Sequence, residues 1–325
     1  MSVLVLSEEC DPTVDAVIDA LQERAVPVFR CDLGWFPASL HLDAGLGGSG
    51  WAGTLRAGNR ETTLEGLRSV LYRRPTAFTF PSGLSGPELR HARMEAKIGL
   101  AGVLGSLPGV LWVNHPARQA DMHKPAQLAA AKAVGLSVPR TLVTNQPDAV
   151  RRFAREVGGL IVVKPLGYAS IEEEGRSRAL YTHVLTDTDL DDLRGVEATA
   201  HLFQEYIADK AYELRLTVVG AGQDSHMFGA AIHAGSTESA VDFRSDYASL
   251  TYRVVDVPDE VAAGVRAFMA YFSISFGCFD FCVDAATGRH WLLECNSAGQ
   301  FQFVEQATDL PITAALADLL MKGAP

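Results

Sequence analysis

FGCFDFCVD at residues 276–284 and WLLECN at residues 291–296 are two apolar runs separated by a short segment that contains AATG. Runs of this length and composition are typical of buried β-strands, and a segment such as AATG is typical of a turn. We therefore predict an antiparallel hairpin. Side chains on a strand alternate between its two faces, so Glu294 and Asn296 share one face of the second strand.

The predicted hairpin brings two carboxylates and an amide oxygen together. If its centre is near Thr287, Asp280 lies opposite Glu294, because the two residues are equidistant from the centre. Charged side chains among apolar strand residues are costly unless they are paired or bind a metal. Asp280, Glu294 and Asn296 offer the hard oxygen ligands that suit Mg²⁺, which also holds substrate phosphates. The sequence therefore predicts a Mg²⁺ site that serves phosphate chemistry.

The composition excludes several classes of protein. The chain has 325 residues, of which 48% are hydrophobic and 21% are charged, as expected for two or three packed globular units. Its formal net charge of -11 argues against sequence-independent nucleic-acid binding, which needs a basic surface. No apolar stretch has the length needed to span a bilayer, and the first residues lack the basic region of a signal peptide. We expect a cytoplasmic protein without a nucleic-acid or membrane partner.

The cysteines are odd in number and lie in or beside apolar strands, so we interpret them as reduced packing residues. Cys278 and Cys282 flank Asp280 on one strand face, and a soft-metal site is the alternative. Zinc sites usually combine CxxC-like loops with nearby histidines, which favours the packing interpretation. The five cysteines are Cys10, Cys31, Cys278, Cys282 and Cys295.

Apolar patterning predicts three domains. Residues 1–116 alternate strands and helices in the manner of an α/β domain. Residues 117–200 have the pattern of a small α+β lid, in which we expect a strand at 179–185. Residues 201–325 contain several strands, the hairpin and a last helix. The glycine- and threonine-rich stretch 40–63 has no helical period and predicts loops and short strands.

No common nucleotide-binding motif accompanies the predicted Mg²⁺ site. The chain has no GxxxxGK[ST], no GxGxxG at a strand-to-helix junction, and no HRD or DFG motif. Lys164 ends an apolar strand and leads into a loop, where its ammonium could reach a phosphate. Lys124, taken alone, has the pattern of a solvated surface residue.

Two further segments carry weaker signals. The backbone of FQEYI at residues 203–207 could form an edge whose N–H and C=O groups hydrogen-bond to adenine. Glu213 and Arg215 share one face of a predicted strand. The alternative for this pair is an ordinary surface ion pair, which contributes little to stability.

The order of these segments resembles the ATP-grasp superfamily. The similarity extends from residue 121 to the last helix and covers about two thirds of the chain. Its segments are DMHKPAQLAAAKAVGLSVPRTLVT, LIVVKP, FQEYI, YELRLTVVG, DFRSD, FGCFDFCVD and LLECNSAGQ. A narrower resemblance is to the graspetide (microviridin-type) maturases, which install side-chain ester or amide crosslinks in a ribosomally made precursor peptide. It rests on YRRP at residues 72–75, KPLGYASIEEEG, ALYTHV and ECNSAGQFQFVEQAT.

The resemblance implies an ATP-grasp fold that combines α/β and α+β parts. An N-terminal α/β domain of the pre-ATP-grasp type, which would bind the peptide, precedes a small central lid and a C-terminal domain with an antiparallel sheet. The resemblance also implies ATP and Mg²⁺ as cofactors, with two ions expected. The partner would be a precursor peptide with leader and core, and a homodimer is left open.

The resemblance further implies a role for each candidate residue. Phosphate contacts would come from Lys124 and Lys164, adenine contacts from Glu205, Tyr206 and Ile207, and ribose contacts from Glu213. Arg215 and Arg244 would face phosphate or the reacting centre, and Asp280, Glu294 and Asn296 would bind Mg²⁺. Arg73 and Arg74 are candidates for contacting the acidic core peptide, with ordinary surface charge as the alternative. The acidic run Glu172–Glu174 would repel phosphate, so we expect it at an exposed tip or facing the peptide.

The implied activity is ATP-dependent activation of an Asp or Glu side chain as an acyl phosphate. A Thr or Ser hydroxyl would then form an ester, or a Lys amine an amide. One alternative is a ligase that joins a small amino acid or amine to a carboxylate, for which a small closed pocket would replace a peptide groove. A second is a non-catalytic, nucleotide-binding regulatory protein, against which the complete set of charged residues argues.

Overall fold

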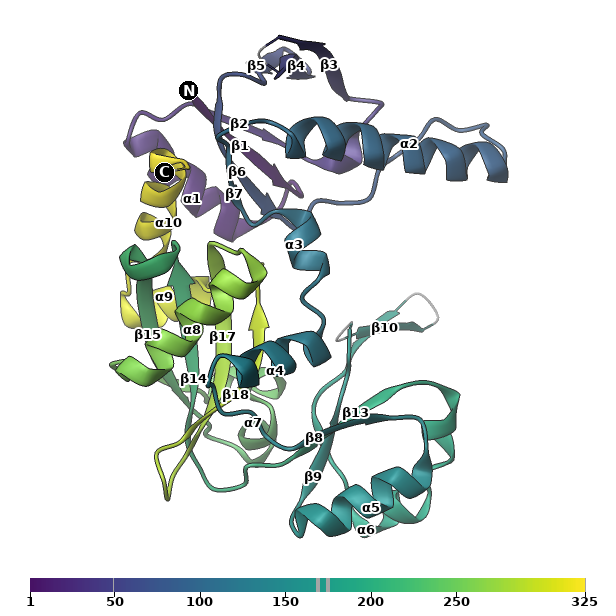
Figure 1. Ribbon diagram of the computed structural model, residues 1–325, viewed down its shortest axis with the longest axis vertical. Helices are drawn as coiled ribbons and strands as arrows, with labels where there is room; N and C mark the ends of the chain where they lie inside the picture. Colours follow the sequence, from purple (N-terminus) through teal and green to yellow (C-terminus); the bar gives the residue numbers. More distant parts are fainter. Residues whose placement is uncertain (49, 168–169, 174–175, 325) are drawn as a thin grey trace.

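A computed structural model describes residues 1–48, 50–167, 170–173 and 176–324 of the chain. These residues form three units, each built around a β-sheet (Figure 1). Within the described ranges, no helix combines the length and the apolar character needed to cross a membrane.

The N-terminal unit is a parallel sheet with helices on both faces. Its strands are β1 (Ser2–Ser7), β2 (Val28–Cys31), β6 (Leu67–Arg73) and β7 (Leu111–Val113), in the order β2-β1-β6-β7. Val3 and Val5 pack towards α1 (Pro12–Glu23) and α10 (Ile312–Lys322), whereas Leu4 and Leu6 pack towards α2 (Gly86–Gly105). Burial on both faces explains why β1 is almost continuously apolar.

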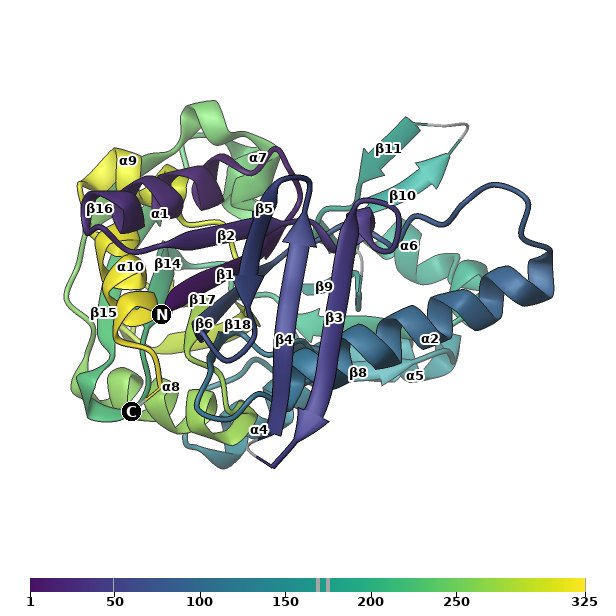
Figure 2. The ribbon, with the colours of Figure 1, turned by 90° about the horizontal axis from the view of Figure 1, so that it is seen from above.

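Residues 40–63 form longer strands than the sequence predicts. They fold into an antiparallel sheet of β3 (Leu40–Gly47), β4 (Gly50–Ala57) and β5 (Arg60–Thr63), which lies beside α2 (Figure 2). Leu40 and Leu55 are buried in the same core as α2. Contact with that core stabilises strands whose glycine content would otherwise weaken them.

The central unit is a small antiparallel sheet with the order β12-β9-β13-β8. Its strands are β8 (Thr141–Thr144), β9 (Ile161–Lys164), β12 (His183–Val184) and β13 (His201–Glu205). α5 (Pro147–Val157) packs on it through Val150 and Phe153. β13 thus lies in this sheet, although a domain boundary at residue 200 would assign it to the next unit. The strand predicted at 179–185 is reduced to β12, because residue 179 already belongs to a separate hairpin of β10 (Ser170–Glu173) and β11 (Arg176–Ala179).

The C-terminal unit is an antiparallel sheet with the order β16-β15-β14-β17-β18. Its strands are β14 (Lys210–Val219), β15 (His226–His233), β16 (Thr251–Val254), β17 (Phe276–Asp284) and β18 (His290–Asn296). Leu214 and Phe279 pack with α4 (Lys124–Ala133) and α8 (Asp259–Phe272). Arg215 and Asp280 follow them on the opposite face of the sheet, where the functional side chains collect.

Short helical segments connect these elements. They are α3 (Pro116–Ala120), α6 (Asp187–Asp191), α7 (Thr237–Val241), α9 (Gln302–Thr308), and the 3₁₀ turns η1 (Leu33–Trp35), η2 (Arg194–Ala198), η3 (Gly222–Asp224), η4 (Phe243–Ser245) and η5 (Tyr247–Ser249).

The predicted hairpin and its register are confirmed. β17 and β18 are antiparallel, and Asp280 pairs with Glu294. The register shifts by one residue, because Phe281 pairs with Leu292 and leaves Leu293 as an extra residue on β18. A one-residue shift moves side chains to the other face of a strand, so this bulge decides that Glu294 shares a face with Asp280.

Candidate functional site

A cavity of about 610 Å³ is lined by residues of all three units. With one exception, the side chains predicted from the sequence to form the site line it. They are Arg74, Lys124, Lys164, Glu205, Tyr206, Ile207, Glu213, Arg215, Arg244, Asp280, Glu294 and Asn296. The exception is Arg73.

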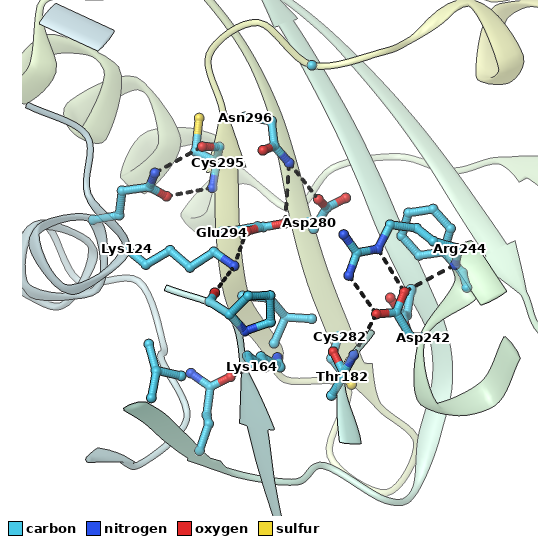
Figure 3. A pocket seen from close by; sticks show the side chains of 18 of the residues that line it. Lys124, Lys164, Thr182, Asp242, Arg244, Asp280, Cys282, Glu294, Cys295 and Asn296 are labelled. Atoms are coloured by element: carbon cyan, nitrogen blue, oxygen red, sulfur yellow. Dashed lines mark hydrogen bonds and ion pairs between the residues drawn. The ribbon is translucent and has the colours of Figure 1, made fainter. Parts of the chain in front are cut away.

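The acidic residues of the hairpin lie on neighbouring strands at one wall of this cavity (Figure 3). Asn296 Nδ2 donates to Asp280 Oδ2 over 3.2 Å and to Glu294 Oε1 over 3.4 Å. Burial raises the pKa of Asp280, although Arg215 opposes the shift. Burial acts in the same direction on Glu294, but Lys124 more than offsets it and holds the pKa of that carboxyl below its usual value.

This donor set fits Mg²⁺. Asp280 and Glu294 supply hard carboxylate oxygens, the ligand type that Mg²⁺ prefers, and Asn296 would add its amide oxygen once the amide turns so that Oδ1 replaces Nδ2 beside them. Burial raises the pKa of the Cys282 thiol to about 12, so the thiol stays protonated at neutral pH. This disfavours the soft-metal alternative, because the thiolate, not the thiol, is the metal ligand.

Arg215 neutralises Asp280 from the neighbouring strand. The two residues are paired across β14 and β17, and Arg215 Nη1 lies 2.7 Å from Asp280 Oδ1 and 2.8 Å from Oδ2. Arg215 Nη2 donates to Gln300 O over 2.7 Å. Burial disfavours the charge on Arg215, but Asp280 more than compensates and raises the pKa of the guanidinium. Arg215 is therefore a permanent, fixed positive charge.

The two predicted phosphate lysines approach the hairpin from different units. Lys124 is the first residue of α4; its Nζ donates to Pro165 O over 2.8 Å and lies 3.1 Å from Glu294 Oε2. Lys164 ends β9, as predicted, and its Nζ donates to Gln204 Oε1 over 2.9 Å. Burial lowers the pKa of Lys164 to about 8, and Glu294 limits the shift.

If Lys164 contacts phosphate, as the resemblance implies, its lowered pKa predicts pH-dependent nucleotide binding. Only the protonated ammonium attracts phosphate, so the affinity for ADP should fall as the pH rises through about 8. Isothermal titration of ADP at a series of pH values measures the effect. Lys164→Arg is the matched control, because a guanidinium stays charged and should remove the pH dependence over this range. An equally steep fall in the Arg variant would assign the titration to another group.

The segment predicted to contact adenine includes the end of β13 and the residues that follow it. Glu205 N donates to Arg140 O and Tyr206 N donates to Leu160 O, each over 2.9 Å. For Ile207 N–H, which follows, the described residues supply no backbone acceptor. Ile207 lines the cavity, so its N–H is a candidate donor for a bound base.

Glu213 is paired with Lys210, a lining residue that the sequence reasoning missed. Lys210 Nζ lies 2.7 Å from Glu213 Oε1 and 5.4 Å from the centre of the Tyr206 ring. Burial raises the pKa of Glu213, while Lys210 opposes that shift. The two residues are three positions apart along the chain, a spacing that the sequence shows but that many surface pairs share.

Asp242 is a second residue that the sequence reasoning missed. Its Oδ1 accepts from Arg244 Nε over 2.8 Å, and its Oδ2 accepts from Arg244 Nη2 over 2.6 Å (Figure 3). Oδ2 also accepts from the backbone N–H of Thr182, in the central unit, over 3.1 Å. Burial opposes ionisation of Asp242, but Arg244 outweighs it and lowers the pKa to about 2. Asp242 therefore orients Arg244 and joins the central unit to the C-terminal unit.

The position of Arg73 contradicts its predicted contact with the peptide. Its side chain is 5% exposed, and its Nε lies 2.8 Å from Asp11 Oδ2. Its Nη1 donates to Ala298 O and to Gly299 O, each over 3.0 Å. Arg73 is thus neither a peptide contact nor a surface charge, because it is enclosed between the N-terminal and C-terminal units. Arg74, the next residue, is exposed and lines the cavity.

The acidic run on the lid is described only in part. The hairpin of β10 and β11 carries Glu173, whose side chain is exposed and lies 3.1 Å from Arg178 Nε. Glu174 lies outside the described residues.

Comparison with known proteins finds that the chain is similar to ATP-grasp proteins. Residues 2–120 match the family described as the MvdD pre-ATP grasp domain. A Chryseobacterium gregarium RiPP-associated ATP-grasp ligase, solved with ADP and with leader and core peptide, has a TM-score of 0.87 and 24% identity over 100% of this chain and 98% of that one. No curated protein matches the sequence.

Two further solved structures are similar over nearly the whole chain. Macrocyclase MdnC from Microcystis aeruginosa MRC, bound with precursor peptide MdnA, has a TM-score of 0.83 and 28% identity over 99% of this chain and 100% of that one. The ATP-grasp ligase PsnB, complexed with a phosphomimetic variant of its minimal precursor, Mg and ADP, has a TM-score of 0.75 and 23% identity over 99% of this chain and 98% of that one.

Proposed function

Because the chain has an ATP-grasp fold and an MvdD-type pre-ATP-grasp domain, we propose that it is an ATP-dependent ligase that crosslinks side chains of a ribosomally made precursor peptide. Both the predicted fold and the predicted resemblance to graspetide maturases are confirmed. The observation that carries the proposal is the convergence of Lys124, Lys164, Asp280, Glu294 and Asn296 in one cavity.

In the proposal, ATP lies between the central and C-terminal sheets. Lys124 and Lys164 contact its phosphates, and the donor at Ile207 N–H reads adenine. Glu213 accepts from the ribose hydroxyls. The complexes of the C. gregarium ligase and PsnB with ADP support this choice of nucleotide.

Asp280, Glu294 and Asn296 would hold Mg²⁺, with two ions expected. When bound, Mg²⁺ neutralises charge on the phosphate oxygens and orients the γ-phosphate. Lys124 and Arg215 already neutralise the two carboxylates, at 3.1 Å from Glu294 and 2.7 Å from Asp280. Lys124 would turn to the phosphates of the nucleotide when an ion takes its place at Glu294, whereas Arg215, which is also bonded to Gln300 O, stays in place.

The reaction begins when an oxygen of a peptide Asp or Glu carboxylate attacks the γ-phosphorus of ATP. The bond between that phosphorus and the β,γ-bridging oxygen breaks, ADP leaves, and the carboxylate becomes an acyl phosphate. A Thr or Ser hydroxyl, or a Lys amine, then attacks the acyl carbon and loses its proton as inorganic phosphate departs. Two anions must meet in the first step, so fixed cations such as Arg215 and Arg244 lower its barrier.

An acyl phosphate must be protected from water. The hydrogen bond from Thr182 N to Asp242 brings the central unit against the segment that carries Arg244. Closure of this kind excludes water, and both reacting side chains belong to one peptide, which makes capture effectively unimolecular. The enzyme therefore needs no nucleophile of its own.

Arg74 is our candidate for the residue that binds the carboxylate of the peptide. It extends from the N-terminal unit to the cavity, and its backbone has a positive φ of 46°. Among the described residues, no carboxylate forms an ion pair with it. A free guanidinium there can hold an acidic side chain by two parallel hydrogen bonds.

Reversing the charge at Arg74 should weaken peptide binding. Arg74→Glu is expected to raise the KM for the peptide about tenfold or more, because a charged hydrogen bond becomes a repulsion. The affinity for ADP should not change. Arg90→Glu, an exposed residue of α2 that does not line the cavity, is the matched control. An unchanged KM in the Arg74 variant would remove it from the peptide site.

The proposed function is tested with a precursor peptide rich in Thr and in Asp or Glu. Incubation with the protein, ATP and Mg²⁺ should remove one water per crosslink, measured by mass spectrometry, and ATP consumption should depend on the peptide. ATP consumption with free amino acids or amines would favour the small-molecule ligase instead. ADP binding without turnover of any substrate would favour the regulatory protein. A cytoplasmic location and a homodimer belong to the same proposal, and cell fractionation and light scattering test them.

A further inference from the structure

The loop that follows Asn296, residues 297–300, is held by side chains from outside the hairpin. Ser297 O accepts from Asn114 Nδ2 over 2.8 Å. Arg73 Nη1 donates to the next two carbonyls, those of Ala298 and Gly299. Each carbonyl up to residue 299 is therefore bonded to a residue of the N-terminal unit.

The far end of the loop is bonded to the reacting centre. Gln300 O accepts from Arg215 Nη2 over 2.7 Å, and Gln300 Oε1 accepts from Thr13 Oγ1 over 2.7 Å. The loop thus connects Asn296, a proposed metal ligand, with Arg215, which neutralises Asp280. A displacement of the loop would move both.

Steric contacts leave the loop little room to adjust. A Cβ added at Gly299 would lie 2.6 Å from Cys278 Cβ and 3.1 Å from Asn296 Cβ. Real Cβ atoms essentially never come as close as 2.6 Å to another heavy atom, so the backbone at Gly299 packs directly against β17. This packing limits the loop on one side, and the hydrogen bonds to its carbonyls hold it there.

Arg73 is itself fixed by a capped helix. Asp11 Oδ2 accepts from Arg73 Nε, while Asp11 Oδ1 accepts from Thr13 N over 3.0 Å and Val14 N over 3.3 Å as the N-cap of α1. Arg73 and Asp11 are 4% and 2% exposed. A buried ion pair of this kind contributes little to the free energy of unfolding on balance. Its role is therefore better explained by the fixed orientation that it gives to the Arg73 side chain.

We infer that Arg73, oriented by Asp11, is a positioning residue that sets the loop 297–300 and thereby the geometry of the metal site. The inference rests on the proposed function, since the metal site is part of it. It replaces the predicted role of Arg73 in contacting the peptide. It also makes the N-terminal unit a structural part of the reacting centre.

Arg73→Lys tests the inference. Lys keeps the positive charge beside Asp11. It lacks the planar guanidinium, whose several N–H groups donate to Asp11 and to two carbonyls at the same time. Mn²⁺, a spectroscopic substitute for Mg²⁺, is titrated in the presence of ADP and followed by electron paramagnetic resonance. We expect the apparent Mn²⁺ affinity and kcat to fall about 10- to 100-fold, the range for groups that orient metal ligands. The KM for the peptide should stay unchanged.

Arg68→Met is the matched control. Arg68 lies on the same strand as Arg73 and donates to Met321 O, so it also joins the N-terminal and C-terminal parts, but away from the loop. This variant should lower the melting temperature and leave the Mn²⁺ affinity unchanged. Asp11→Asn should reproduce the defect of Arg73→Lys, and the double variant should be no worse than Arg73→Lys alone.

The outcomes separate the inference from the proposed function. If Arg73→Lys lowers only the melting temperature, as Arg68→Met does, Arg73 is structural and the inference is wrong. A raised peptide KM with normal Mn²⁺ affinity would restore its role as a peptide contact and also overturn the inference. If the unmodified protein binds Mn²⁺ and ADP but modifies no peptide, the proposed function fails, while the Mn²⁺ titrations still decide the role of Arg73.

Discussion

Replacing Glu294 with Gln is expected to lower Mg²⁺-dependent turnover by at least about 100-fold, because loss of a direct ligand exceeds the 10- to 100-fold cost of losing an outer-shell partner. Gln keeps the size of the side chain but removes the charge that an ion needs. The fold should survive, because the ion pair lost with Lys124 is partly exposed, at 21% and 23%, and contributes little to stability. ATP consumption with peptide measures the effect, and thermal unfolding checks the fold.

The control for Glu294→Gln is Asp284→Asn on the same hairpin. Asp284 accepts from Thr287 N and Thr287 Oγ1, each over 2.7 Å, at the turn and does not line the cavity. Its loss should weaken the turn slightly without changing turnover. If Glu294→Gln retained normal turnover at the same Mg²⁺ concentration, Glu294 would not be a metal ligand.

Replacing Arg215 with Met should cost stability as well as activity. The variant leaves Asp280 buried without its partner, which typically costs about 3–5 kcal/mol in unfolding free energy. Both residues are buried, at 5% and 8% exposed, so water in the cavity replaces the lost pairing only in part. Urea unfolding of the protein measures the loss.

A second substitution separates the two effects of Arg215→Met. Adding Asp280→Asn removes the unpaired charge, so the double variant should recover most of the lost stability. Its turnover should stay abolished, because both a fixed cation and a metal ligand are missing. A double variant as unstable as Arg215→Met alone would show that packing of the Arg215 side chain, for instance against Phe303 at 5.9 Å, matters more than its charge.

The hairpin shows how much of the structure the local sequence pattern can predict. Alternation and symmetry about the turn predicted that Asp280 pairs with Glu294, and it does. The prediction did not include the bulge at Leu293, which brings the pairing back to that register. A bulge is an adjustment of one backbone to its neighbour, and one extra residue leaves no clear mark in the pattern of apolar residues.

Asp242 and Lys210 show where local pattern was insufficient. Both lie within three residues of a predicted site residue, so their positions along the chain were visible. Their roles depend on distances to Thr182 N and Glu213, and the contact with Thr182 crosses from the C-terminal unit to the central unit. Charged residues at such spacings are common on surfaces, so the spacing alone could not select them.

The sequence by itself determined the hairpin, the strand that ends at Lys164, their polar residues and the resemblance that orders them, because periodicity and residue chemistry are local properties. It could not distinguish the roles of the two arginines of YRRP, because they are neighbours in the chain and have the same side chain. Only the tertiary structure separates Arg73, buried against Asp11 and the loop 297–300, from Arg74, exposed at the cavity. The physical reason is that burial of a charge depends on which distant groups meet it, and those groups lie 62 and more than 220 residues away along the chain.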